Sequence, residues 1–238
     1  MVRAAAAPVG VNDARRVLPL VLVVVALSWC ALAIMPMSHD QMSHGQLGFV
    51  AMWTLMAMAM MIPTALRPLV RIAGGSALRA WAFLGGYLMI WAAMAVPATV
   101  LVNVIPWSGL LISLGWIAVG LYQLTPWTQR ALRRCRSLRA ADPAFASGTK
   151  EGLACVTACF PLMLIGVVTL TGLQTAVSLL AMLALAVFMT WEKAPRVGSV
   201  ALRASGIAIV LVASLLLALG GPATGHQHSI SDPTQLVW

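Results

Sequence analysis

Long apolar runs, separated by short segments that hold most of the charge, are the feature that most limits how this chain can fold. Seven such runs approach the roughly 20 residues that cross a bilayer as a helix. They lie at about residues 17–36, 47–66, 80–104, 109–127, 152–172, 175–192 and 203–220. Hydrophobic residues make up 61% of the chain and charged residues only 9%, against about 25% charged in a soluble domain. We therefore predict an all-α, polytopic transmembrane helix bundle that forms one membrane-embedded domain over residues 1–238.

The basic residues all fall in alternate connections between these runs. The four groups are Arg3, Arg15 and Arg16; Arg67, Arg71 and Arg79; Arg130, Arg133, Arg134, Arg136, Arg139 and Lys150; and Lys193, Arg196 and Arg203. The positive-inside rule then places the N-terminus in the cytoplasm and the C-terminus outside, in a bacterial plasma (inner) membrane. Orientation accounts for the net charge of +9, so we do not expect nucleic-acid binding, which needs a basic soluble face.

The first apolar run has a second interpretation. Arg15 and Arg16, the run itself and Ala31-Leu32-Ala33 resemble a signal peptide with a small-residue cleavage site. Cleavage would leave six helices. The run is long for a signal, so we favour a retained first helix.

The outer side of the predicted bundle is rich in histidine and methionine. The residues are Met35, Met37, His39, Asp40, Met42 and His44 after the first helix, and His226 and His228 in the tail. Imidazole suits Cu(II) and zinc, whereas thioether sulfur suits Cu(I). This loop therefore predicts a copper site, and the alternative is a solvated loop without metal.

Two predicted helices carry sulfur at helical spacing. In the second helix Met52, Met56 and Met60 lie four residues apart, and in the fifth Cys155, Cys159 and Met163 do the same, so each set occupies one helix face. Thiolates and thioethers favour Cu(I). The alternative is packing, because methionine and buried cysteine both serve as apolar filler. Counting 1.5 Å per residue from opposite sides puts the two sets at similar depths, which permits a shared site.

Cys135 and Glu192 are expected at the cytoplasmic side. Cys135 lies between Arg134 and Arg136 in a predicted loop, where cationic neighbours favour a thiolate that could receive or release metal. Glu192 closes the sixth helix beside Lys193. We favour an interfacial glutamate that reaches water or pairs with that lysine, over a functional acid deep in the membrane. The four cysteines are expected to be reduced.

Six short motifs occur in a characteristic order along the chain. They are Met52-Trp53-x-x-Met56-x-Met58-x-Met60-Met61-x-Pro63, Gly86-Tyr87-x-x-x-Trp91, Gly120-Leu121-Tyr122-Gln123-Leu124-Thr125-Pro126, Cys135-Arg136-Ser137, Gly152-x-x-Cys155-x-x-x-Cys159 and Glu192-Lys193. With these motifs, about residues 47–220 resemble the predicted metal-binding integral membrane proteins of the bacterial DUF2182 family. The resemblance implies a copper-chaperone-like protein that delivers copper to, or assembles, a copper enzyme. It assigns the metal role to Met56, Met60, Cys135, Cys155 and Cys159.

Together these patterns predict a copper-handling accessory protein surrounded by lipid. Its partner would be a copper-dependent enzyme or an extracytoplasmic copper protein, and Cu(I) is favoured within the membrane. A transporter or channel for copper or another soft metal is the first alternative, and a metal-free structural subunit of a membrane complex is the second. We do not expect an enzyme, because the sequence shows no membrane histidine for haem and no Ser/His or carboxylate pair placed for acid–base work.

Overall fold

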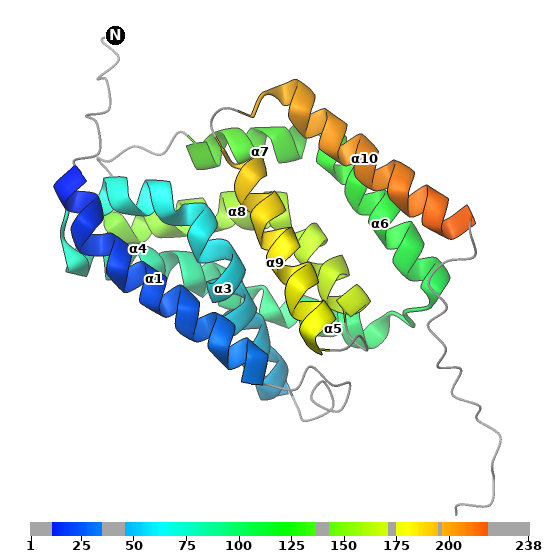
Figure 1. Ribbon diagram of the computed structural model, residues 1–238, viewed down its shortest axis with the longest axis horizontal. Coiled ribbons are helices and arrows are strands. Elements are labelled where there is room, and N and C mark those ends of the chain that lie inside the picture. The colour runs from blue at the N-terminus through cyan, green and yellow to red at the C-terminus, as the bar shows by residue number, and fades with distance from the viewer. Residues whose placement is uncertain (1–10, 35–45, 137–142, 171–174, 195–196, 219–238) are drawn as a thin grey trace, which may run out of the picture.

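The protein is helical throughout the part of the chain that the computed structural model describes, residues 11–34, 46–136, 143–170, 175–194 and 197–218 (Figure 1). The helices are α1 (Val11–Ile34), α3 (Gln46–Ala73), α4 (Ala77–Ala93), α5 (Ala95–Val104), α6 (Gly109–Leu124), α7 (Pro126–Arg136), α8 (Ala144–Leu170), α9 (Thr175–Glu192) and α10 (Ser199–Ala218). No strand occurs within those ranges. The expected all-α class is confirmed for them.

Four stretches are long and apolar enough to cross a membrane: Val17–Ile34, Leu47–Ala73, Ala77–Val104 and Ala144–Leu170. A fifth arises if α6 and α7, which are bent by 66° at their junction, form one broken span. Two shorter apolar helices cover Ala176–Glu192 and Val200–Leu215. These elements match the seven predicted segments one for one. A membrane protein is thereby supported, while seven spans and the orientation of the termini stay predictions.

Three helix boundaries differ from those predicted. Helix α3 continues to Ala73 with Pro63 and Pro68 inside it, α7 is helical where a loop was expected, and α8 begins at Ala144. Prolines are tolerated within membrane helices because neighbours can satisfy the carbonyl that they free. The prediction that Cys135 lies in a loop is therefore wrong, since it lies on α7.

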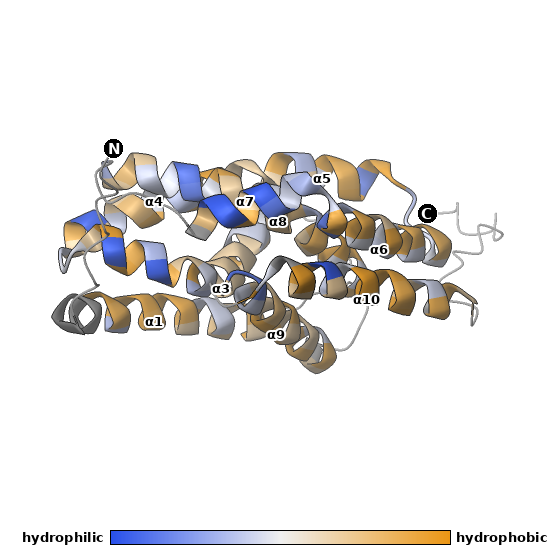
Figure 2. Cartoon of the chain, turned by 90° about the horizontal axis from the view of Figure 1, so that it is seen from above, coloured by the Kyte–Doolittle hydropathy of each residue, from blue (hydrophilic) through white to orange (hydrophobic). Residues whose placement is uncertain are grey.

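Helix α7 is amphipathic, which explains why an apolar-run analysis misses it. Leu132 and Cys135 are buried, whereas Arg130, Arg133 and Arg134 are exposed. The buried face packs against α8. In Figure 2 this helix is a band of hydrophilic residues across the near side of the bundle.

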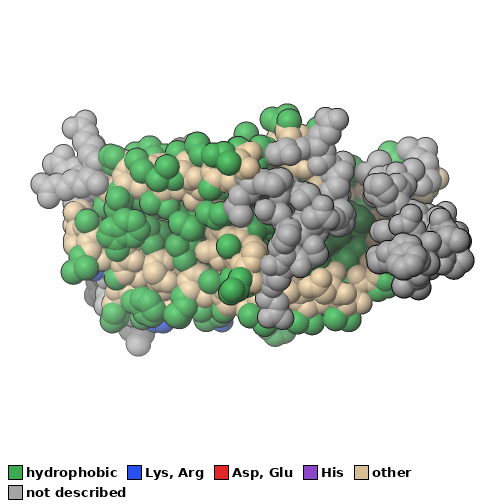
Figure 3. Space-filling model, turned by 90° about the horizontal axis from the view of Figure 1, so that it is seen from below, with side chains coloured by type: hydrophobic (Ala, Val, Ile, Leu, Met, Phe, Trp, Pro, Cys, Tyr) green, Lys and Arg blue, Asp and Glu red, His purple; other side chains and the backbone are tan. Residues whose placement is uncertain are grey.

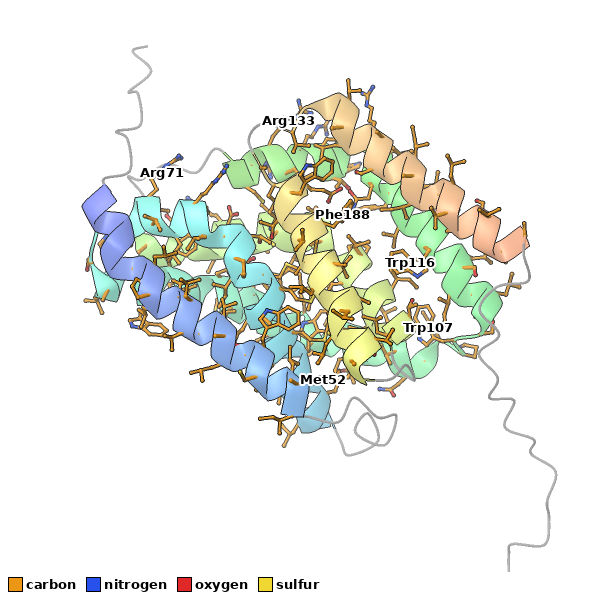
Figure 4. The ribbon with its side chains drawn as sticks, in the orientation of Figure 1. Met52, Arg71, Trp107, Trp116, Arg133 and Phe188 are labelled. Atoms are coloured by element: carbon orange, nitrogen blue, oxygen red, sulfur yellow. The ribbon has the colours of Figure 1, made fainter. Side chains whose placement is uncertain are left out.

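The two ends of the bundle differ in charge. Arg71 at the end of α3 and Arg133 on α7 lie at one edge, and Met52 and Trp107 lie at the opposite one (Figure 4). Seen from that opposite side, the molecule is covered by hydrophobic side chains, with Lys and Arg visible only at its margin (Figure 3). This distribution agrees with the sidedness that the sequence predicts.

Glycines bring α4 and α8 into backbone contact. A Cβ at Gly148 would overlap the carbonyl oxygen of Phe83, and one at Gly86 would overlap the carbonyl oxygen of Phe145. Small residues allow such close approach between membrane helices. The approach places Tyr87, next to Gly86, against the middle of α8.

Trp53 holds α3 against α4 and α8. Its indole Nε1 donates a hydrogen bond of 3.0 Å to the carbonyl oxygen of Trp91. Its ring also lies 5.7 Å from that of Phe160 on α8, in an edge-on arrangement. Trp53 therefore connects α3 with both α4 and α8.

Candidate metal centre

The centre of the bundle contains a group of sulfur atoms contributed by two helices. Cys155 Sγ on α8 lies 3.9 Å from Met61 Sδ on α3. Cys159 lies one turn further along α8 on the same helix face, and its side chain interacts with that of Cys155. All three side chains are fully or almost fully buried. The two helices meet at Cys155, which their matched depths permitted, but the methionine in contact with Cys155 is Met61 and not one of the predicted Met52, Met56 and Met60.

Lys193 adds a positive charge to this group. Its Nζ donates to Cys155 Sγ at 2.7 Å and to Thr64 Oγ1 at 2.8 Å. The residue follows the last turn of α9, where its backbone N–H still donates to the carbonyl of Met189. Because a buried charge has to be paired or hydrogen-bonded, the side chain is held inward by sulfur and hydroxyl partners.

Tyr87 completes the group from α4. Its hydroxyl donates to the carbonyl oxygen of Met61 at 3.2 Å and lies 3.0 Å from Cys155 Sγ. One sulfur atom is therefore surrounded by side chains from α3, α4 and the end of α9. We call Met61, Thr64, Tyr87, Cys155, Cys159 and Lys193 the central cluster.

A second buried pair lies one turn from the central cluster, toward the basic end. The side chain of Cys135 on α7 interacts with that of Glu151 on α8, which precedes Cys155 by one helical turn. Glu151 is 1% exposed, and its Oε2 has no hydrogen-bond partner. Cys135 therefore faces protein and does not lie in a solvated loop as predicted.

Glu192 is buried as well, which corrects the prediction of an interfacial side chain that reaches water. Its exposed fraction is 2%. Its carboxylate accepts hydrogen bonds from Ser205 Oγ at 3.0 Å and from Gln123 Nε2 at 3.5 Å. Glu192 thus links α9 to α6 and α10.

The remaining predicted ligands fall into two groups. Met56, Met60 and Met163 are buried in the core, and Met52 is partly exposed near the start of α3. The predicted outer ligands lie outside the described residues: Met35, Met37, His39, Asp40, Met42, His44, His226 and His228. The structure therefore leaves the predicted His/Met loop untested.

The donor set of the central cluster suits a soft monovalent ion. Across the residues that the structure describes, no group of three or more His, Cys, Asp or Glu could hold one metal ion. A site here would consequently combine the two cysteines with methionine sulfur. Thiolate and thioether ligands are those that select Cu(I).

Comparison with known families bears on which ion is relevant. The family model described as "PpoB2: Copper chaperone" matches residues 50–216. The chain belongs to the PpoB2 copper chaperone family. No curated protein and no solved structure matches the chain significantly.

Membership of the copper chaperone family confirms part of the predicted resemblance. It supports a copper-handling role, while the DUF2182 label stays a prediction. The matched range includes the whole central cluster, but it ends before the tail that carries His226 and His228. It also begins after the His/Met loop, so the match covers neither of the two predicted outer groups of ligands.

Several residues that meet in this copper chaperone carried no predicted role as ligands: Met61, Thr64, Tyr87, Glu151 and Lys193. Met61, Tyr87 and Lys193 did occur in the motifs that carried the resemblance. The position of Glu151 could also have been predicted, because it precedes Cys155 by four residues and so lies on the same helix face.

Proposed function

We propose that the protein binds Cu(I) as cargo through Cys155, Cys159 and Met61, and delivers it to a copper-dependent enzyme or an extracytoplasmic copper protein. The observation that carries this proposal is the sulfur group itself. Cys155 Sγ lies 3.9 Å from Met61 Sδ, and the side chain of Cys159, one turn along α8, interacts with that of Cys155. Membership of a copper chaperone family supports copper as the ion.

The surroundings of these sulfurs favour retention of a soft ion. The three side chains are at most 2% exposed, so water is kept from competing as a ligand. Cu(I) prefers the thiolate and thioether donors present here to oxygen ligands. The predicted His/Met loop, with His39 and His44, would supply copper to this site from outside.

The test is copper binding by purified protein in detergent or nanodiscs under reducing, oxygen-free conditions. Bound copper per chain and competition with a chromophoric Cu(I) chelator are measured for Cys155→Ser, Cys159→Ser and the double variant. Cys30→Ser is the matched control, because Cys30 is an exposed cysteine on α1. The control should bind as the wild type does, while the double variant should lose the bound ion. Equal stoichiometry in the double variant would refute the proposed ligands.

Delivery is tested separately, because a transporter would use the same ligands. Copper-loaded protein is mixed with a metal-free copper enzyme, and enzyme activity is followed against a control with free copper and chelator. In parallel, vesicles that contain the protein are assayed for copper uptake. Transfer without uptake supports delivery, whereas uptake that depends on Cys155 would replace delivery by transport.

A further inference from the structure

We infer that Lys193 makes the central cluster selective for monovalent over divalent soft cations. The inference rests on the proposed function, since it concerns the same cysteine and methionine ligands. The geometry that carries it is the contact of the lysine Nζ with Cys155 Sγ at 2.7 Å. A second contact, to Thr64 Oγ1 at 2.8 Å, keeps the ammonium group beside the sulfur.

The charge of the metal complex explains the selectivity. When Cu(I) binds, the thiols of Cys155 and Cys159 each release a proton to the medium, and the complex of one cation with two thiolates carries one negative charge. Zn(II) displaces the same two protons, but its two-thiolate complex is neutral. Met61 adds a thioether, which changes neither charge. The two complexes therefore differ by one unit of charge, whatever protons are exchanged with the medium.

An ammonium group within contact distance discriminates between these two complexes. It attracts the anionic Cu(I) complex and gains little from the neutral Zn(II) complex. Lys193 is 8% exposed, and in such a site Coulomb interactions are much stronger than in water. Replacing the lysine with a neutral residue should therefore weaken Cu(I) binding relative to Zn(II) binding.

Two buried carboxylates oppose this effect without removing it. Glu151 lies one turn from Cys155 on α8, and its side chain interacts with that of Cys135. Glu192 is held by Ser205 and Gln123. Both carboxylates are present in the wild type and in every Lys193 variant, so the comparison of Lys193→Met with Lys193→Arg isolates the charge at position 193.

The experiment compares dissociation constants for Cu(I), Ag(I) and Zn(II) in full-length protein, each by competition with a chromophoric chelator. Lys193→Met removes the charge and keeps an unbranched apolar chain, and Lys193→Arg restores the charge. Lys150→Met is the matched control, since Lys150 is an exposed lysine on α8, where solvent screens its charge. For Lys193→Met, the ratio of Cu(I) to Zn(II) affinity should fall about tenfold or more. The Ag(I) affinity should fall with that of Cu(I), and both other variants should keep the wild-type ratio.

The outcomes separate this inference from the proposed function. Cu(I) binding with an unchanged metal ratio in Lys193→Met, or an equal loss for all three ions, overturns the inference alone. A wild-type protein that binds no Cu(I) overturns the proposed function as well. If Lys193→Met does not fold, Thr64→Val provides the same comparison by removing the second ammonium contact, with a smaller fall in the ratio expected. An unchanged ratio in that variant overturns the inference.

Discussion

Replacing Gly148 with alanine should force α4 and α8 apart and weaken the site that their contact supports. A Cβ at Gly148 would lie 3.0 Å from the backbone nitrogen of Tyr87, whereas ordinary contact begins at 3.4 Å. The helices must therefore separate by at least 0.4 Å there (3.4 − 3.0), and by more at the Phe83 carbonyl. Overpacking of this kind costs about 1–3 kcal/mol. For a chain of this size each kcal/mol lowers the melting temperature by about 2–4 °C.

The same separation should lengthen the 3.0 Å contact between the Tyr87 hydroxyl and Cys155 Sγ. Because such a hydrogen bond is worth about 1 kcal/mol, Cu(I) affinity should drop by up to about tenfold. The assay is thermal unfolding of protein in nanodiscs, with chelator competition on the same samples. Gly85→Ala is the matched control, since the nearest atom to its Cβ is a ring carbon of Phe145 at 4.0 Å. Gly148→Ala protein that melts with the control and binds copper equally well would refute this account of helix packing.

Three further predictions concern the groups around the sulfurs. Tyr87→Phe removes the donor to the Met61 carbonyl and the contact with Cys155. It should lower the free energy of unfolding by about 0.5–1.5 kcal/mol and weaken Cu(I) binding. An unchanged melting temperature and Cu(I) affinity would contradict this prediction. Trp53→Phe removes the hydrogen bond to the Trp91 carbonyl, and should lower stability by about 1–3 kcal/mol without changing copper stoichiometry, whereas loss of copper would show that Trp53 acts on the site. Stripping copper from loaded protein should lower its melting temperature, because an ion present at a hundred times its dissociation constant stabilises the folded state by about 2.7 kcal/mol; identical melting curves would argue against binding to the folded protein.

Apolar length and charge were sufficient to predict the positions of the long helices, but not the extra structure at the basic end. The apolar runs correspond to the long helices because lipid leaves few other ways to satisfy backbone groups. Helix α7 cannot be found in this way, because its arginines interrupt the apolar run. Its only apolar signal is the buried face that carries Leu132 and Cys135. The second apolar run was predicted to end at about residue 66, whereas α3 continues through Pro68 to Ala73.

The candidate site was predictable only as far as helical periodicity reaches. The spacing of Cys155 and Cys159 correctly placed both cysteines on one buried face of α8. Which of two adjacent methionines approaches Cys155 depends on the rotation of α3 about its axis, and that rotation is set by tertiary contacts such as the Trp53 hydrogen bond. A lysine at the end of a helix can extend to water or turn inward. Its inward course depends on Thr64 and Cys155, which lie far from Lys193 in sequence.

Burial of the central cluster has a kinetic consequence. Cys155 is 0% exposed and Cys159 2% exposed, so a bound ion would have almost no surface that a small chelator can attack directly. Its departure then requires transient opening of the helices, at a rate that the chelator concentration does not change. A protein acceptor that docks and widens this opening would draw the ion out faster than any passive scavenger. Slow release of the ion to small chelators and rapid transfer to a docked protein acceptor would then both follow from the same closed interior.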